Sequence, residues 1–578
     1  MRAPDPLAVA AQPADALLKS TLARLTQGIS PASIAGAYLD WLVHLAGSPA
    51  KWGELGVKAQ RKLSRFAIAS LQSARNWEPC IEPLPQDKRF EHPDWCAWPF
   101  NLLQQGFLLT QQWWWNATTG VRGVSAHHEQ VVEFMTRQWL DMFSPSNFPL
   151  TNPEVLRETV HRAGANLVQG AINWWDDALR VAANRPHTGL ERWRVGDNLA
   201  VTPGKVVYRN HLIELIQYAP QTGEVRPEPL LIVPSWIMKY YILDLQPRNS
   251  LVKFLVGRGY SVFMISWKNP TARERELGLE DYIKGGVLAA LDAIGKIVPG
   301  TRAHVLGYCL GGTILTMAAA LLAREGNERL ATLALLAAET DFEEPGELSL
   351  FIDESQVSFL EDMMFTRGYL DGKEMAGAFA LLNSKDLVWS RMVHDYLMGK
   401  RDEVSDLMAW NADATRMPYR MHSEYLRRLY LGNDFTEGRF MVDGRPIALS
   451  DIRAPVFAVG TSRDHVSPWR SVYKINLFAD TEVTFLLTSG GHNVGVVNPP
   501  EGFAGASYRV STRRSDDRYV DPETWEAATP VRQGSWWPEY AAWLDVRSGA
   551  PVAPPPMGAP GKGLPPLNDA PGRYVLEE

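Results

Sequence analysis

The chain of 578 residues has few cysteines and no long apolar run, and both absences narrow the class of protein. Its three cysteines, Cys80, Cys96 and Cys309, cannot form an even disulfide framework, which favours a reducing compartment. No stretch approaches the roughly 18 consecutive apolar residues needed to cross a bilayer. We therefore expect a cytoplasmic protein without a membrane span, although adsorption to an apolar surface stays open.

Clusters of basic residues and metal-binding spacings are absent as well. The formal net charge is −7, and nucleic-acid binding depends on clustered Lys and Arg, so we expect no nucleic-acid partner. No Cys or His spacing matches a zinc site, and we expect no metal. With 46% hydrophobic and 21% charged residues the composition is that of a soluble globular protein, and the length predicts two or more packed units.

In the first third of the chain the apolar residues recur with the period of a helix. Residues 1–15, interrupted by prolines, are expected to be a loose leader, and 16–195 a helical N-terminal domain. Over 151–180 apolar residues recur at three to five residues, and Asn152 followed by Pro153 predicts the start of a helix. Three consecutive tryptophans, Trp113 to Trp115, cannot share one amphipathic face. At least one is expected to meet another subunit, domain or apolar surface.

From residue 196 to 578 short apolar runs alternate with helical stretches, which is typical of a parallel sheet with helices on both faces. This predicts an α/β fold, with an insertion at about 343–450 that caps the carboxyl edge of the sheet. The Pro- and Gly-rich tail, 548–578, is expected to be a linker or a draped segment. The apolar runs, which we predict to be strands, are LLIVPSW, SVFMISW, HVLGYC, TLALLAA, PVFAVGT and VTFLLTS.

The segment HVLGYCLGGT has the form strand, G-x-C-x-G, helix, which is a nucleophile elbow with cysteine as the nucleophile. Cys309 is expected in a strained turn at positive φ, where side chains at Gly307 and Gly311 would collide with their neighbours. Its place at a helix N-terminus favours the thiolate. The alternative is a buried structural cysteine on an apolar strand.

An acid and a histidine follow in the order that this elbow requires. Asp464 and His492 each follow an apolar run, so both are expected at the edge of the sheet that carries Cys309. His465 is a competing base, but it is held beside Asp464, whereas His492 comes from a separate loop. The alternative role for Asp464 is to cap a loop.

An oxyanion hole needs the backbone N–H after the nucleophile, here that of Leu310, and one from the loop after an earlier strand, for which we choose Ile237. Trp236, Tyr240, Tyr308 and His465 are candidates for the substrate pocket. Trp236 and Tyr240 have an equally plausible interpretation as core aromatics.

These motifs resemble those of the polyhydroxyalkanoate synthases, which polymerise hydroxyacyl-CoA thioesters into storage polyester. The resemblance spans nearly the whole chain, in order. It implies an α/β-hydrolase fold with a mobile cap and an N-terminal helical domain that supports dimerisation and contact with the polyester granule. A tyrosine before the cysteine, here Tyr308, is similar to what the class I enzymes of this family carry. Those enzymes act alone and prefer short-chain groups such as 3-hydroxybutyryl. The segments that carry the resemblance are GYCLGGT, VPSWIMKYYILDLQP, GTSRDHVSPW, SGGHNVGVVNPP, SPSNFPLTNPE and PGRYV.

The resemblance implies that Cys309, activated by His492, is acylated by the (R)-3-hydroxyacyl-CoA, and that a hydroxyl then captures the acyl group with help from His492 or Asp464. Coenzyme A comes with the substrate, and no further cofactor is expected. Two alternatives stay open: a cysteine-dependent polyester depolymerase or esterase on the same fold, and a non-catalytic granule-coating protein. Cys96 and the tryptophan run have no place in the family pattern.

Overall fold

The computed structural model describes residues 20–23, 26, 28–72, 78–85, 87–372, 374–375, 385–500 and 505–578, so the expected leader over 1–15 lies outside the described residues. The chain divides into two compact units. The first comprises Met1–Gly28, Arg192–Ala376 and Val404–Glu578, and the second Ile29–Glu191 and Gly377–Glu403. One piece of the insertion expected at about 343–450 therefore belongs to the second unit.

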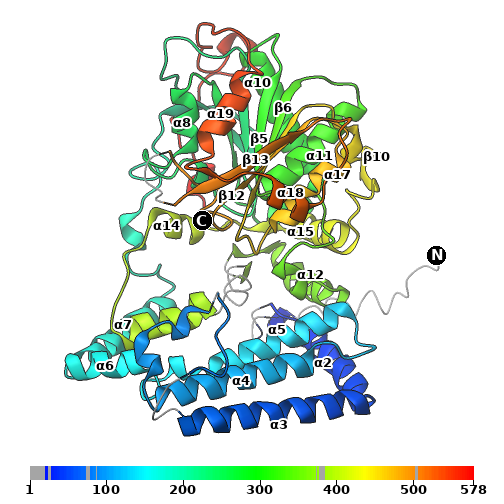
Figure 1. The fold of residues 1–578 in the computed structure, drawn as a ribbon. Helices are drawn as coiled ribbons and strands as arrows, with labels where there is room; N and C mark the ends of the chain where they lie inside the picture. The colour runs from blue at the N-terminus through cyan, green and yellow to red at the C-terminus, as the bar shows by residue number, and fades with distance from the viewer. Residues whose placement is uncertain are drawn as a thin grey trace. The chain divides into compact units, whose positions relative to one another are not determined.

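The first unit is built on a ten-stranded sheet of order β1-β2-β4-β3-β5-β6-β11-β12-β13-β14 (Figure 1). The six strands from β4 to β12 in this order are parallel, and the strands at both edges are antiparallel. The bounds are β1 Gly204–Arg209, β2 Ile213–Tyr218, β3 Leu230–Val233, β4 Val262–Trp267, β5 Ala303–Tyr308, β6 Leu330–Leu336, β11 Val456–Thr461, β12 Val483–Thr488, β13 Ser507–Arg513 and β14 Arg532–Gln533.

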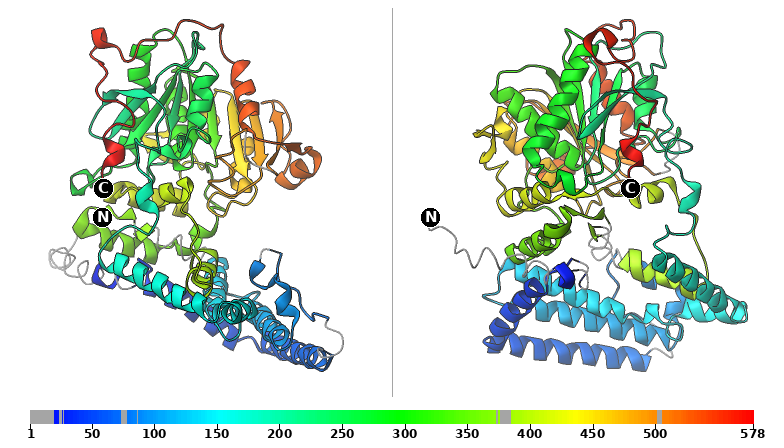
Figure 2. Two further views of the ribbon diagram at one scale, coloured as in Figure 1. Left: turned by 90° about the vertical axis from the view of Figure 1, so that its left-hand side faces the viewer. Right: turned by 180° about the vertical axis from the view of Figure 1, so that it is seen from behind.

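Each of the six predicted apolar runs forms one of the parallel strands, and these strands are almost wholly buried because helices cover both faces. On one face α8 and α19 meet through the rings of Phe254 and Trp537, whose centroids are 5.6 Å apart. The opposite face carries η7, α10 and α11 (Figure 2). The bounds are α8 Leu251–Gly257, α9 Leu279–Asp281, η7 Tyr282–Leu288, α10 Ala289–Ile297, α11 Leu310–Arg324, α16 Trp469–Tyr473, α17 Ile475–Phe478, α18 Pro522–Ala528 and α19 Trp537–Asp545.

The chain between β6 and β11 contributes helices, the hairpin of β9 and β10 and the antiparallel pair of β7 and β8 to the first unit. Its contacts with the loop that follows β3 are direct: the Thr415 hydroxyl donates to the Trp236 carbonyl (2.7 Å) and Trp410 Nε1 to the Lys239 carbonyl (2.7 Å). The elements are η8 Glu347–Phe351, α12 Glu354–Arg367, β7 Tyr369–Leu370, α14 Asp406–Asn411, β8 Met417–Pro418, α15 Tyr419–Glu424, η11 Tyr425–Leu431, β9 Phe440–Val442, β10 Arg445–Ile447 and η12 Leu449–Asp451.

The second unit is helical and has its own apolar core where α2, α3, α4 and α5 meet, with Trp41, Leu45, Leu55 and Val132 buried. Trp113 and Trp114 pack against this core, with ring centroids 5.3 Å apart, whereas Trp115 is 56% exposed. The tryptophan run is thus divided between core and surface. The helices are α2 Pro31–Ala46, α3 Pro49–Gln72, α4 Phe100–Thr118, α5 Ala126–Met142, α6 Pro153–His161 and α7 Ala165–Ala182.

The predicted helix start at Asn152 and Pro153 is confirmed, because the Asn152 side chain accepts from the N–H groups of Glu154 (2.9 Å) and Val155 (3.2 Å). The helical pattern over 151–180 is nevertheless interrupted. Ala163 (φ 49°) and Gly164 (φ 83°) adopt left-handed backbone, which ends α6 and lets α7 begin at Ala165.

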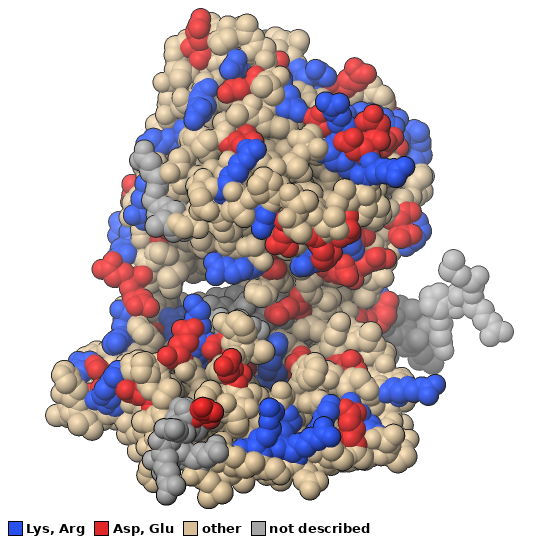
Figure 3. All heavy atoms as spheres, viewed as in Figure 1, with Lys and Arg blue, Asp and Glu red and all other residues tan. Residues whose placement is uncertain are grey.

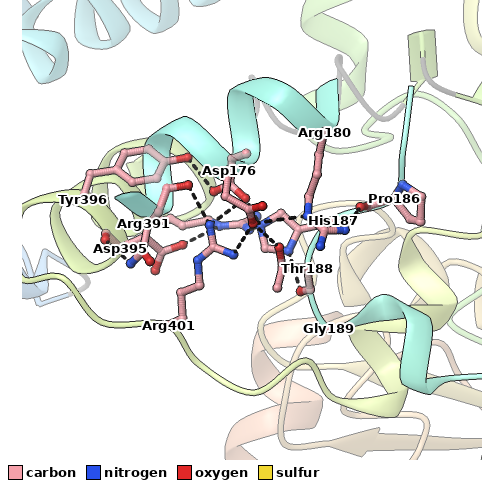
Figure 4. A network of polar contacts seen from close by, with 12 residues as sticks. Asp176, Arg180, Pro186, His187, Thr188, Gly189, Arg391, Asp395, Tyr396 and Arg401 are labelled. Carbon is pink, nitrogen blue, oxygen red and sulfur yellow. Dashed lines mark hydrogen bonds and ion pairs between the residues drawn. The ribbon is translucent and has the colours of Figure 1, made fainter. Parts of the chain in front are cut away.

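The buried face of α7 is its polar one, and it packs against the returning segment 385–403. Asn173 Nδ2 donates to the Asp395 carbonyl (2.9 Å), and a Cβ at Gly170 would lie 1.7 Å from the Tyr396 carbonyl oxygen. Figure 4 shows the charged network that flanks this contact, in which Arg401 donates to Asp176 (3.2 Å). The Tyr396 hydroxyl also donates to Asp177 (3.0 Å). Hydrogen bonds and ion pairs, rather than apolar packing, therefore hold α7 against the segment 385–403.

On the face drawn in Figure 3, Lys and Arg are interspersed with Asp and Glu over both units. Among the described residues no helix is long and apolar enough to cross a membrane. Within the same residues no group of three or more His, Cys, Asp or Glu side chains could hold a metal ion.

Candidate active site

Cys309 stands between β5 and α11, at φ 52° and ψ −129°, as the predicted elbow requires. The steric role of the two glycines is confirmed. A Cβ at Gly307 would lie 2.3 Å from the Gly312 Cα, and one at Gly311 would lie 2.2 Å from the Val233 carbonyl oxygen. The turn can therefore close only without side chains at these positions, and it places the sulfur at the start of α11.

Sheet order places the predicted residues at a common edge. Strands β5, β6, β11 and β12 are consecutive neighbours and parallel, so the loops after them emerge at the same carboxyl end. Cys309 follows β5, Asp464 follows β11 and His492 follows β12. The Cys309 N–H donates to the carbonyl of Leu336, the last residue of β6, at 2.9 Å.

Asp464 and His492 are joined through Asp464 Oδ2 and His492 Nδ1, which are 2.8 Å apart. The Thr461 hydroxyl also donates to Oδ2 (2.7 Å), while the N–H groups of Val466 (2.9 Å) and Ser467 (2.8 Å) donate to Oδ1. The carboxylate is thus fixed in place by its own loop. Because Nδ1 faces the acid, Nε2 is the ring nitrogen available to the sulfur.

The charges of Cys309, Asp464 and His492 influence the pKa values of the histidine and the acid. Burial lowers the pKa of His492, but the charges of Asp464 and Cys309, together with hydrogen bonds from both, outweigh it and hold that pKa well above its usual range. Burial raises the pKa of Asp464, and the charge and hydrogen bond of His492, with donors from Ser467 and Thr461, bring it below its usual value. These interactions therefore make His492 a stronger base than a free imidazole, as removal of a thiol proton requires.

His465, the competing base, is exposed, and its backbone carbonyl accepts from the Glu347 N–H at 3.3 Å. No described hydrogen bond joins its ring to Asp464. Of the two histidines, His492 is the one that the structure brings to the acid.

The two predicted oxyanion donors belong to the elbow itself and to the loop after β3. Leu310 is the first residue of α11, where backbone N–H groups have no intrahelical acceptor. Ile237 lies in the loop after β3, and this loop is held from two sides: the Thr415 N–H donates to the Ile237 carbonyl (3.1 Å), and Trp267 Nε1 donates to the Pro234 carbonyl (2.9 Å). The loop is therefore fixed by the insertion as well as by the sheet.

Two of the predicted pocket aromatics lie near the catalytic candidates. The Tyr308 ring is 5.6 Å from the His492 ring, and its hydroxyl donates to Asn493 Oδ1 at 2.6 Å. The Trp236 ring meets Tyr425 of the insertion edge to face at 5.9 Å, and its buried Nε1 has no hydrogen-bond partner among the described residues.

Tyr240 lies elsewhere. Its pKa is raised well above the usual value by burial and by the charge of Asp244. No described contact joins Tyr240 to Cys309 or His492, so a role in the substrate pocket stays a prediction.

Sequence reasoning missed three residues of this neighbourhood. Tyr425 and Tyr430, from η11, are joined hydroxyl to hydroxyl at 3.2 Å, and Glu339 follows β6. The pKa of Tyr425 and that of Tyr430 are both raised by burial, and the charges of Cys309 and Glu339 add to the effect. Tyr425 and Tyr430 are far from Cys309 in the sequence, so no local pattern predicts that they lie near it. Glu339, in contrast, could have been noticed as an acid directly after an apolar run.

The strand order, the elbow and the acid–histidine pair define an α/β-hydrolase-fold protein with a cysteine at the nucleophile position. In agreement, residues 228–499 match the family model described as the alpha/beta hydrolase fold, which confirms the expected fold class. Residues 86–255 match the model of the poly-beta-hydroxybutyrate polymerase (PhaC) N-terminus, and residues 9–51 match a second N-terminal model of that polymerase.

Curated relatives extend this match to nearly the whole chain. The poly(3-hydroxyalkanoate) polymerase of Methylorubrum extorquens is 40% identical over 549 residues, which cover 92% of this chain and 89% of the relative. The poly(3-hydroxyalkanoate) polymerase subunit PhaC of Cupriavidus necator is 35% identical over 558 residues, covering 95% of this chain and 92% of the relative. The chain belongs to the poly(3-hydroxyalkanoate) polymerase family, as the sequence motifs predicted.

Proposed function

We propose that this protein is a class I enzyme that polymerises (R)-3-hydroxyacyl-CoA, with 3-hydroxybutyryl-CoA as the preferred substrate, and releases coenzyme A. The observation that carries the proposal is the pair of His492 and Asp464 beside Cys309 at the elbow, in a chain of the polymerase family. Coenzyme A arrives with the substrate, and the mechanism uses no other cofactor.

In the first half-reaction His492 takes the proton of the Cys309 thiol, and the sulfur attacks the thioester carbonyl carbon. The N–H groups of Leu310 and Ile237 hold the oxyanion. The tetrahedral intermediate collapses with cleavage of the bond to the coenzyme A sulfur, and this thiolate takes the proton from His492. Exchange of one thioester for another is nearly neutral in free energy, so the acyl group stays activated.

In the second half-reaction a 3-hydroxyl group attacks the acyl-cysteine. His492 takes the hydroxyl proton, with Asp464 holding the imidazolium, and an oxoester bond forms as the bond to Cys309 breaks. The sulfur then recovers the proton from His492. Water would hydrolyse the chain instead, and the aromatic residues of the insertion, Tyr425 among them, exclude it.

Cys309 is only 9% exposed, so substrate access requires the insertion to move aside. The second unit is proposed to support a homodimer and to contact the polyester granule, because a group of large apolar side chains on it is exposed. Those on α4 and α7 are Leu103, Trp115, Val168, Ile172, Trp174, Trp175, Leu179 and Val181.

The test supplies the purified protein with 3-hydroxybutyryl-CoA and follows free thiol and turbidity together. Thiol with insoluble polymer supports the polymerase, thiol with only free hydroxy acid indicates a hydrolase, and no reaction indicates a coat protein. Cys309→Ala should release no thiol, while Cys96→Ala, at an exposed cysteine, should match the wild type. Polymer made by Cys309→Ala would show that the nucleophile is a different residue.

A further inference from the structure

Glu339 lies at the edge of the sheet that carries Cys309, Asp464 and His492, although the proposed mechanism assigns it no role. It follows β6, and β6 lies between β5, which leads to Cys309, and β11, which leads to Asp464. The chain leaves the strand through Ala337, whose φ of 47° is in the left-handed region, and the Thr313 hydroxyl donates to the Glu339 carbonyl at 2.8 Å. Since Thr313 is in the first turn of α11, the backbone of Glu339 is fixed against the elbow.

The side chain of Glu339 is buried and incompletely paired. It is 5% exposed, and its Oε1 atom has no hydrogen-bond partner among the described residues. Asp341, two residues later, is equally buried but accepts from Lys474 Nζ (2.8 Å) and Asn433 Nδ2 (2.9 Å). A buried polar atom without a partner destabilises the fold, so Glu339 has no structural task of the kind that Asp341 fulfils.

The surroundings of Glu339 favour its neutral form. Burial raises its pKa well above the usual range, the charges of Asp464 and Cys309 raise it further, and His492 opposes them only in part. A neutral carboxyl group carries one O–H donor and retains acceptor capacity, so it can pair with an alcohol in either direction. The charges of Glu339 and Cys309 both raise the pKa of Tyr425 and that of Tyr430, so the carboxyl group and the sulfur share these two tyrosines as neighbours.

We propose that Glu339 binds the 3-hydroxyl group of the acyl substrate and thereby selects 3-hydroxyacyl thioesters over unsubstituted ones; this rests on the proposed function. An unsubstituted acyl chain cannot form this hydrogen bond and leaves the buried carboxyl group unpaired. A site built to hydrogen-bond a substrate hydroxyl discriminates against the analogue without it by about 10⁴ to 10⁵. The substrate hydroxyl supplies the hydrogen-bond partner that Glu339 Oε1 lacks. Binding therefore relieves the destabilisation that the unpaired buried atom causes in the free enzyme.

The experiment compares single-turnover release of coenzyme A from 3-hydroxybutyryl-CoA and from butyryl-CoA. We expect the wild type to favour the hydroxylated substrate by at least about 10²-fold. Glu339→Leu should lower this ratio by about 10²-fold, through slower reaction of 3-hydroxybutyryl-CoA alone, and Glu339→Gln, whose amide donates and accepts, should restore part of it. Asp341→Asn is the matched control on the same loop: its thermal stability should fall while the ratio stays at the wild-type value.

Three outcomes would overturn the inference. They are a wild-type ratio near one, an unchanged ratio in folded Glu339→Leu, or an equal loss for both substrates, which would indicate a role in supporting the elbow. If Glu339→Leu does not fold, as judged by circular dichroism, the wild-type ratio decides. Failure of the proposed function looks different: the wild type would then release no coenzyme A from 3-hydroxybutyryl-CoA, or would release it with only free hydroxy acid and no polymer.

Discussion

Substitution of Gly311 by alanine tests how closely the elbow is packed against the neighbouring strand. An added Cβ would lie 2.2 Å from the carbonyl oxygen of Val233 and 2.4 Å from that of Pro234. Ordinary contact begins at 3.4 Å, so these backbone atoms must move by about 1.2 Å. Side-chain rotation cannot relieve the clash, because both neighbours are backbone.

The displaced segment is the one that carries Ile237, the proposed second oxyanion donor. A misplacement of about 1 Å at a catalytic group lowers the rate by about 10²-fold. Overpacking of a core contact also costs about 1–3 kcal/mol of the free energy of unfolding. We expect Gly311→Ala to show both losses.

The assay measures urea unfolding and the initial rate of coenzyme A release from 3-hydroxybutyryl-CoA. Gly295→Ala in α10 is the control, because a Cβ there would meet nothing within 4 Å. It should gain about 0.5–1 kcal/mol from the reduced backbone freedom of the unfolded chain, with no change in rate.

Wild-type rate and stability in Gly311→Ala would refute the packing argument. Lower stability with an unchanged rate would instead leave the elbow intact and show that the loop after β3 does not supply the oxyanion donor.

Three further predictions concern the acid, a buried histidine and the returning segment. Asp464→Asn removes the charge that supports the imidazolium, so thiol alkylation of Cys309 at neutral pH should slow and turnover fall by about 10²- to 10⁴-fold; unchanged alkylation would contradict this role. Burial lowers the pKa of His304 to about 4, so the unfolded chain binds its proton more readily. The contribution of His304 to the free energy of unfolding should therefore be fully present above pH 6.5 and be lost as the pH falls towards 4, by at most about 1.4 kcal/mol per pH unit. Urea unfolding should show a smaller loss over this pH range in His304→Asn than in the wild type. Equal losses in the two proteins would contradict this role of His304. Gly170→Ala should free the segment 385–403 from α7 and speed tryptic cleavage within it, whereas Gly53→Ala, where a Cβ would meet nothing within 4 Å, should cleave like the wild type.

The parallel strands and the elbow were predictable because their signals are local. A strand buried on both faces needs a continuous apolar run, and each of the six runs predicted to be strands formed one. The outer strands gave weaker signals. β13, for example, is only partly buried and reads SYRVSTR, without an apolar run, because it pairs near the edge of the sheet.

The polar face of α7 was not predictable from periodicity. Ile172, Trp175 and Leu179 mark an apolar stripe, yet they are exposed, while Asn166 and Asn173 are buried. Their partners are backbone carbonyls of Leu397 and Asp395, more than two hundred residues later in the chain. A pattern within one helix carries no information about such a partner.

The sequence by itself determined the α/β fold, the cysteine at the strand-to-helix turn, and the loops that carry Asp464 and His492, because short-range sterics and apolar runs specify them. Only the tertiary structure decided which histidine meets the acid and that Glu339 lies between the two catalytic strands. Those outcomes depend on the order of strands in the sheet, and strand order follows from packing across the whole unit, which neighbouring residues in the chain do not encode.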